Sequence, residues 1–418
     1  MKRLILKAGL FVFLLPHLLS AQTSERLSLQ QAISIATENN SDVLQAQREI
    51  EAAGGRVLQA GRISPLELSI VYNETPTKGR LGEAAEQDIE FSQTIEFPGK
   101  RGLRMDAAEL GQKAVELSLE RTKTIVIARV KQAYFQALLA GEIARNLEFT
   151  ITLLSDFLKV VTDRYQTQAS SYLDVLRTKV ELTRLRNDRV EANRDYELRL
   201  AELNILLGRS GEVAIALSDS LRYAPLSLSQ QDAIAQFASQ SFFLQITEQQ
   251  VLQSQSMYQL AQRSYYPDFS IGAALQRRPG QLSPIGSSTY FGLGLGLSIP
   301  LWFWHGPKGE VQEAQASVGA STIRLEAARR RVRQSIAAAY RTARVAEQQL
   351  IVFDSSLLKD VEDELRTGIA AYQNNQIDAL NLFDIYRTYR STKIEYARAL
   401  YNFSAAVAEL EASKEVPE

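Results

Sequence analysis

The sequence predicts a mainly α-helical protein that also carries the strands of a membrane β-barrel, arranged as one unit that occurs twice. Three observations lead to this fold class: two long stretches without proline, four short segments of alternating apolar and polar residues, and matching residues in the two halves of the chain. The chain has 418 residues and no cysteine, which excludes disulfides, thiolate metal sites and thiol catalysis.

Residues 1–21 predict a secretory signal peptide. Lys2, Arg3 and Lys7 surround the start of an apolar run that ends at the small residue Ala21. An amphipathic N-terminal anchor is the alternative interpretation. Cleavage after Ala21 removes three basic and no acidic residues, so the formal net charge changes from −1 to −4, which argues against a general nucleic-acid binder. No later apolar run reaches about 18 residues, so a membrane segment would have to consist of strands.

Long helices are predicted in the proline-free stretches 99–224 and 308–416, because proline breaks helix interiors. We expect a very long helix over about 102–166 followed by one over 171–207, and the same pair over about 308–372 and 376–411. Heptad spacing supports side-by-side packing of these helices. One apolar seam comprises Ala144, Leu147, Ile151, Leu154, Leu158, Val161 and Tyr165.

Strands are predicted at about 64–97 and 267–300, where apolar and polar residues alternate. Alternation over about nine residues is typical of membrane-barrel strands, with apolar side chains outward and small or polar ones inward. An ordinary two-hairpin sheet on a soluble core would show the same pattern. The clearest apolar series is Phe291, Leu293, Leu295, Leu297 and Ile299, which alternates with three glycines and a serine.

The two halves of the chain match at a slowly drifting offset. Tyr134 corresponds to Tyr340, and Ala201-Glu202-Leu203 recurs 207 positions later as Ala408-Glu409-Leu410. This pattern indicates a duplicated unit with small insertions. We place the repeats at 22–211 and 226–412, with a linker over 212–225 and a C-terminal tail over 413–418. Each repeat is expected to contain a helix, two strands, a very long helix and a further helix.

One chain supplies four strands, which are too few to close a barrel, and open strand edges are not tolerated in lipid. Two chains would give eight strands and three chains twelve. Because an eight-stranded barrel is filled by its own side chains, a transport function favours at least three chains.

Short motifs near the ends of the long helices resemble those of a known family. Tyr165 is followed by Leu173-Asp174-Val175-Leu176, and Tyr372 by Leu380-Asn381-Leu382-Phe383-Asp384. With the repeat and the signal peptide, these motifs resemble the TolC-like outer-membrane efflux channels across essentially the whole mature chain. The segment Ile95–Gly102 is similar to the strand-to-helix junction of the heavy-metal (CzcC/CusC-like) subgroup.

The resemblance implies a homotrimer in the bacterial outer membrane, with a twelve-stranded barrel in lipid and a twelve-helix tunnel in the periplasm. It implies a passive conduit for substrates, heavy-metal cations among them, that works with a periplasmic adaptor (membrane fusion) protein and an inner-membrane pump of the resistance-nodulation-division type. No enzymatic activity and no cofactor are expected. Protein secretion or drug efflux through the same kind of channel stays open, and the rival class is a soluble periplasmic coiled-coil tether.

The resemblance also assigns site residues at the periplasmic tip. Asn381 and Asp384 match the two positions of the acidic pore constriction, where three chains would each contribute one side chain to a ring. The family's pattern has aspartate at both positions, so the ring at Asn381 is neutral here. Asp174 and Tyr372 match the links that close the tunnel, whereas the arginine of that network is replaced by Ile377. The alternative for Asp384 is an ordinary solvated helix residue.

Aromatic residues gather where the strands are expected to meet the helices. An aromatic belt at the membrane interface is the favoured interpretation, and a buried cluster is the alternative. Its members are Tyr265, Tyr266, Trp302, Phe303 and Trp304.

Other candidate sites lack support. His305 is the only histidine after residue 21, so neither a histidine metal site nor a Ser-His-Asp triad is indicated. The glycines at 292, 294 and 296 lie within an alternating strand and not in a phosphate-binding loop. The basic run over 329–333 is interpreted as a solvated helix face.

Overall fold

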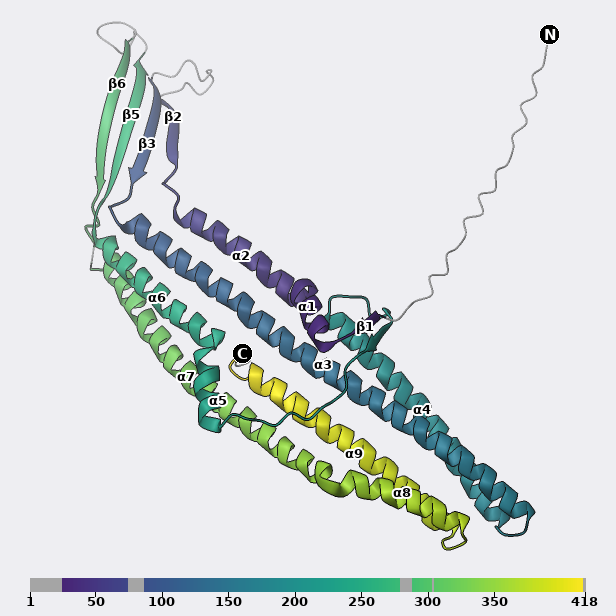
Figure 1. Ribbon diagram of the computed structural model, residues 1–418. Coiled ribbons are helices and arrows are strands. Elements are labelled where there is room, and N and C mark those ends of the chain that lie inside the picture. The colour runs from purple at the N-terminus through teal and green to yellow at the C-terminus, as the bar shows by residue number, and fades with distance from the viewer. Residues whose placement is uncertain (1–24, 74–85, 279–287, 303, 416–418) are drawn as a thin grey trace, which may run out of the picture.

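The computed structural model describes residues 25–73, 86–278, 288–302 and 304–415 (Figure 1). The molecule is elongated, with a four-stranded sheet at one end and two helical hairpins turning at the other. The predicted signal peptide lies outside the described residues.

The sheet consists of β2 (Leu66–Asn73), β3 (Glu86–Ile95), β5 (Asp268–Arg278) and β6 (Ser288–Ser298), antiparallel in the order β2-β3-β5-β6. The register aligns apolar residues across the strands, with Leu68 opposite Phe91 and Leu275 opposite Phe291. This apolar face is open to solvent in the single chain, and Leu295 is 89% exposed. The opposite face carries the small and polar residues, since Gly272 pairs with Gly294 and Ala274 with Gly292.

The helices after the strands are long. In the first repeat α3 (Lys100–Gln166) runs for 67 residues and is followed by α4 (Tyr172–Leu206). In the second repeat α7 (Gly306–Val352) gives way to one π-helical turn, η3 (Phe353–Leu357), before α8 (Leu358–Gln373) and α9 (Ala379–Ala412). The single regular helix expected over 308–372 is therefore interrupted.

Two helices, and not the single helix expected, precede each pair of strands. They are α1 (Leu29–Asn39) and α2 (Ser41–Ala60) in the first repeat, and α5 (Gln230–Ser239) and α6 (Phe242–Gln262) in the second, where a short 3₁₀ turn, η2 (Arg263–Tyr265), follows. The breaks occur at capping residues. The Asn40 side chain accepts from the Asp42 amide, and the Ser241 hydroxyl accepts from the Leu244 amide.

The linker between the repeats is bound to both long helices. The short strands β1 (Glu25–Leu27) and β4 (Ile215–Leu217) pair in parallel. The Tyr134 hydroxyl on α3 lies 2.9 Å from the Leu27 carbonyl, and the Tyr340 hydroxyl on α7 lies 2.9 Å from the Leu228 carbonyl. The duplication is thus visible in equivalent contacts.

Packing orders the helices into a curved wall. Near the sheet α2 packs on α3, α3 on α6 and α6 on α7, and further away α3 also contacts α4 and α9. Among the described helices, none has the length and apolar character needed to cross a membrane.

Candidate functional site: the hairpin tip and the strand–helix junction

The tip of the molecule is formed by the α3–α4 turn and the α8–α9 turn, which lie at the same end (Figure 1). Each turn contains one non-glycine residue with positive φ, Gln168 at 57° and Asn375 at 60°. Behind the turns, Phe157 packs edge-on against the rings of Tyr372 (4.8 Å between centroids) and Phe383 (5.6 Å). The two hairpins of one chain therefore share an aromatic core.

Asp174 and Tyr372 are brought close together through a serine. The Asp174 carboxylate caps its own helix, accepting from the Ser171 hydroxyl at 2.9 Å and the Ser170 hydroxyl at 3.2 Å. Ser170 also lies beside the phenol of Tyr372, which is 4% exposed. Burial raises the pKa of this phenol, while the neighbouring Ser170 hydroxyl and the Arg164 charge act in the opposite direction.

Arg164 is a tip residue that the sequence analysis missed. Its Nη1 donates to the Tyr372 carbonyl at 2.6 Å, and its guanidinium lies 4.6 Å from the centre of the Tyr372 ring. Ile377, where the resemblance placed the missing arginine, is partly buried against the aromatic core of the tip. A basic residue in the last turn of α3 was the available signal, because arginines often bind carbonyls at helix ends.

Asn381 and Asp384 both lie on the exposed side of α9, three residues apart. The Asn381 amide donates to the N-capping carboxylate of Asp378 at 2.8 Å. Asp384 accepts from Arg387 at 3.4 Å, and both side chains are largely exposed. The sequence analysis missed this arginine, which offsets part of the Asp384 charge.

At the other end, the segment from Ile95 to Gly102 joins the sheet to α3. Gly99 caps α3 with a φ of 94°, a conformation that favours glycine. Asp268 at the start of β5 accepts from the Phe97 amide at 2.7 Å and from the Lys100 ammonium at 2.8 Å. Arg104 binds both carboxylate oxygens of Glu96, at 2.6 and 3.0 Å. These contacts fix the angle between strand and helix.

The predicted aromatic belt forms two separate pairs in the described structure. Tyr266 stacks on Phe97 at 4.6 Å, and Trp302 meets Trp304 edge-on at 5.4 Å. In the single chain Trp302 is 69% exposed, and Tyr265 and Tyr266 are also exposed. Phe303 lies outside the described residues.

No group of three or more histidine, aspartate or glutamate residues is arranged to hold a metal ion within the described part of the chain. The geometry instead describes a wall of long helices, tightly turned at one end and joined rigidly at the other to a sheet with one apolar face. This is the form of a channel protomer.

The family model described as outer membrane efflux protein matches residues 32–209 and 233–413, so the chain belongs to the outer membrane efflux protein family. It is 20% identical to the cobalt-zinc-cadmium resistance protein CzcC of Cupriavidus metallidurans over 417 residues, covering 96% of each chain. The fold is that of CusC (TM-score 0.74, 16% identity, 92% and 91% coverage) and of the CmeC outer membrane channel of Campylobacter jejuni (TM-score 0.73, 14% identity, 93% and 85% coverage).

The chain is therefore an outer-membrane efflux channel with a large periplasmic portion. Members of this family form trimers and work with an adaptor and an inner-membrane pump.

Proposed function

We propose that three copies of this chain form a continuous channel that exports heavy-metal cations, fed by a periplasmic adaptor and a resistance-nodulation-division pump. The observation that carries the proposal is the sheet: it has an exposed apolar face, and its outer strands β2 and β6 each have an edge unpaired among the described residues. Similarity to CzcC over 96% of both chains supports metal ions as the cargo.

Closure of the sheet requires more than one chain. Unpaired strand edges are costly in lipid, and β2 of one copy can pair with β6 of the next. Three copies give twelve strands, which leaves room for a lumen lined by the small residues opposite the apolar face. The exposed Trp302 and Trp304 would then lie at the membrane interface, where tryptophan is favoured.

The constriction of the proposed trimer lies at Asn381 and Asp384. Three copies place three Asp384 carboxylates around a narrow axis, where they attract cations and repel anions. Arg387 weakens this field because it pairs with Asp384 within each chain.

The closed state of the proposed channel is held by contacts between the two hairpins of each chain. Ser170 donates to Asp174 and lies beside the Tyr372 phenol, and Arg164 adds a charged hydrogen bond to the Tyr372 carbonyl. Opening separates the hairpins and breaks these contacts, so they oppose leakage at rest.

A complementation experiment tests the cargo and the constriction together. Deletion of the gene should sensitise cells to zinc, cobalt or cadmium, and the wild-type chain should restore growth. Asp384→Asn should restore it only partly, whereas Asp363→Asn, an exposed aspartate paired with Arg366 in the same way, should restore it fully. Sensitivity to dyes, detergents and antibiotics alone would contradict the metal cargo and favour drug efflux.

The assembly has its own test. The protein extracted from outer membranes in mild detergent should have the mass of about three chains. A monomer free in the periplasm would contradict the channel and favour the coiled-coil tether.

A further inference from the structure

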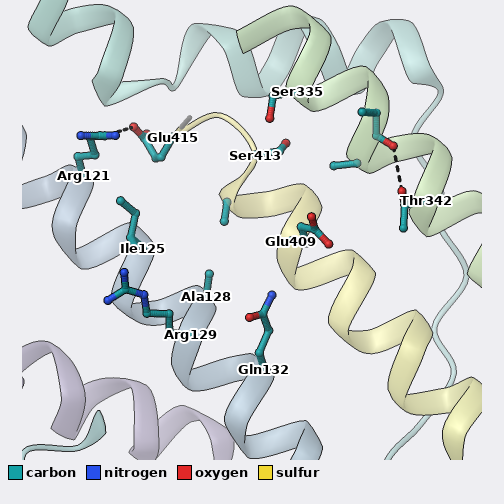
Figure 2. Close-up of a pocket in the computed structure, with 13 residues that line it drawn as sticks. Arg121, Ile125, Ala128, Arg129, Gln132, Ser335, Thr342, Glu409, Ser413 and Glu415 are labelled. Atoms are coloured by element: carbon teal, nitrogen blue, oxygen red, sulfur yellow. Dashed lines mark hydrogen bonds and ion pairs between the residues drawn. The ribbon is translucent and has the colours of Figure 1, made fainter. Parts of the chain in front are cut away.

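Two open cavities lie one after the other along one face of the helical wall. The upper one, of about 660 Å³, is lined by α2, α3, α6 and α7. The lower one, of about 620 Å³, is lined by α3, α7 and the end of α9 (Figure 2). On α7 the lining residues of both cavities form one continuous stripe from Arg324 to Thr342. The cavities therefore belong to a single surface.

This surface is the concave face of the wall. The upper cavity touches Glu49 on α2 and Arg324 on α7, although α3 and α6 separate these two helices. Side chains of the two outer helices of a curved wall converge only on its concave side.

The linker lies on the opposite face. Glu347 on α7 binds the linker residue Tyr223, Tyr340 on α7 binds Leu228 just after the linker, and Arg329 pairs with Glu248 on α6 at 3.1 Å. At about 100° per residue, Arg329 points about 160° away from Arg331. The basic run in α7 is thus divided between two faces.

The upper cavity has an excess of positive charge. Three arginines line it, Arg121, Arg324 and Arg331, against the single carboxylate of Glu49. Arg121 lies 4.0 Å from the buried carboxylate of Glu415. Within the described residues, Arg324 and Arg331 have no carboxylate within ion-pair distance, and both are exposed. Two guanidinium groups one heptad apart on α7 therefore face the cavity without an acidic partner.

We propose that this cavity binds oxyanions, namely small solutes carrying carboxylate or phosphate groups, through Arg324 and Arg331 with Arg121 at its floor. A guanidinium offers paired N–H donors whose spacing matches two oxygens of a carboxylate or phosphate. A volume of about 660 Å³ accommodates a molecule of the size of citrate.

The effect of this oxyanion site on transport rests on the proposed trimer. In that assembly the concave faces of three chains surround the tunnel, so the arginines form a basic belt between the Asp384 ring and the barrel. A bare divalent cation is repelled at this belt, whereas the same cation held in an anionic carboxylate complex is attracted. The proposed tunnel would then attract cations at the Asp384 ring and carboxylate or phosphate groups at the arginine belt.

Binding is tested by titration calorimetry on the detergent-solubilised full chain, with citrate and inorganic phosphate as the probes and no metal. Wild type should bind citrate, and Arg324→Gln/Arg331→Gln should weaken binding roughly tenfold or more. Arg329→Gln removes an arginine from the opposite face of the same helix and should bind like wild type. Absence of citrate binding by wild type, or equal loss in the Arg329→Gln control, would overturn the proposal.

Ion selectivity provides a second measurement that separates this inference from the channel itself. In planar bilayers under a salt gradient, the double variant should be several-fold more cation-selective than wild type, and Arg329→Gln should not change the reversal potential. Absence of any conducting pore would contradict the proposed channel. A pore whose ion selectivity and citrate binding are the same in the Arg324→Gln/Arg331→Gln variant as in wild type would overturn the oxyanion site alone.

Discussion

The first repeat holds one unbroken helix from the sheet to the tip, whereas the second repeat interrupts the equivalent path with a π-helical turn. Both sequences have the same heptad spacing and similar length, so the pattern of apolar residues does not explain the difference. The interruption lies at 353–357, whereas α3 stays α-helical although it contains Thr150, Thr152, Ser155 and Asp156. The continuity of a long helix is therefore not encoded in its heptad spacing alone.

The two repeats also bind the linker with opposite chemistry. On α3 the Tyr134 hydroxyl lies 2.8 Å from a linker carboxylate, that of Asp219, which also accepts from the Leu29 amide at 2.7 Å. On α7 the carboxylate belongs to the helix, where Glu347 accepts from the linker hydroxyl of Tyr223 at 3.2 Å and from the amide of Leu226, just after the linker, at 2.8 Å. Glu347 is buried and Asp219 is exposed. The contact made by α7 therefore depends more on its carboxylate than the contact made by α3 does.

The largest effect is expected from Glu347→Ala. It removes a buried carboxylate that accepts from the Leu226 amide and the Tyr223 hydroxyl, at a cost of about 3 kcal/mol. Thermal unfolding of the solubilised protein should show a clear fall in Tm. The matched change Asp219→Ala should cost less, because water can replace its carboxylate. Equal losses would show that the two contacts are equivalent.

Arg164→Ala breaks the contact between the hairpins at the tip. Loss of a charged hydrogen bond costs about 2 kcal/mol. The substitution destabilises the closed state more than the open one, because the contact exists only when the hairpins are together. We expect higher conductance at rest in planar bilayers and greater entry of large antibiotics such as vancomycin into cells. Arg145→Ala, an exposed arginine paired with Glu142 on the same helix, should leave both unchanged. A closed channel in the Arg164 variant would remove Arg164 from the gate.

A smaller difference is expected between Tyr134→Phe and Tyr340→Phe. Each removes one hydroxyl that binds the main chain near the start of its repeat, worth about 1 kcal/mol. Tyr134 is fully buried and also meets Asp219, so its loss should lower the Tm more than loss of the partly buried Tyr340. The reverse order would mean that the carboxylate of Asp219 contributes little.

The smallest effect concerns Glu415, which caps α6 by accepting from the amides of Phe242 and Phe243, both at 2.9 Å. Burial raises the pKa of this carboxyl above its ordinary value of 4.5, against the opposing effects of these amides, Lys414 and Arg121. A raised pKa in the folded state means that this group's contribution to stability falls as the pH rises through the window above 4.5.

The Tm of Glu415→Gln minus the Tm of wild type should therefore increase by roughly 1–2 °C when the pH is raised from 4 to 7. Unfolding curves of both proteins at the two pH values measure this. A difference that does not vary with pH would show that Glu415 keeps an unperturbed pKa.

Much of the architecture could be predicted from the sequence because it depends on periodic patterns. Proline-free stretches and alternating segments gave the long helices and the four strands, and the duplication gave their order. The split of each leading helix was not foreseen, since it depends on single capping residues, Asn40 and Ser241, within otherwise helical sequence. Within the C-terminal tail expected over 413–418, the described residues Ser413 and Glu415 are buried, and Glu415 accepts from two amides about 170 residues away in sequence.

The candidate site was less predictable. Resemblance supplied Asp174, Tyr372, Asn381 and Asp384 as positions, and whether they act as a gate and a constriction remains for the experiments above. Their actual partners, Ser170, Arg164 and Arg387, depend on how two turns approach one another, which no spacing along the chain encodes. Which face of the wall each arginine of the basic run in α7 occupies likewise depends on how α6 packs against α7.

The unbroken length of α3 has a mechanical consequence. Its 67 residues make a rod of about 100 Å, held at the membrane end by Gly99, Lys100 and Arg104. Rotating such a rod by about 5° about that end moves its tip by about 9 Å, close to the width of one helix. In the proposed trimer, a rod of this length would convert a small tilt near the membrane into a large displacement at the tip. In the second repeat the π-helical turn divides the equivalent path into α7 and α8, and α9 packs against both α3 and α7.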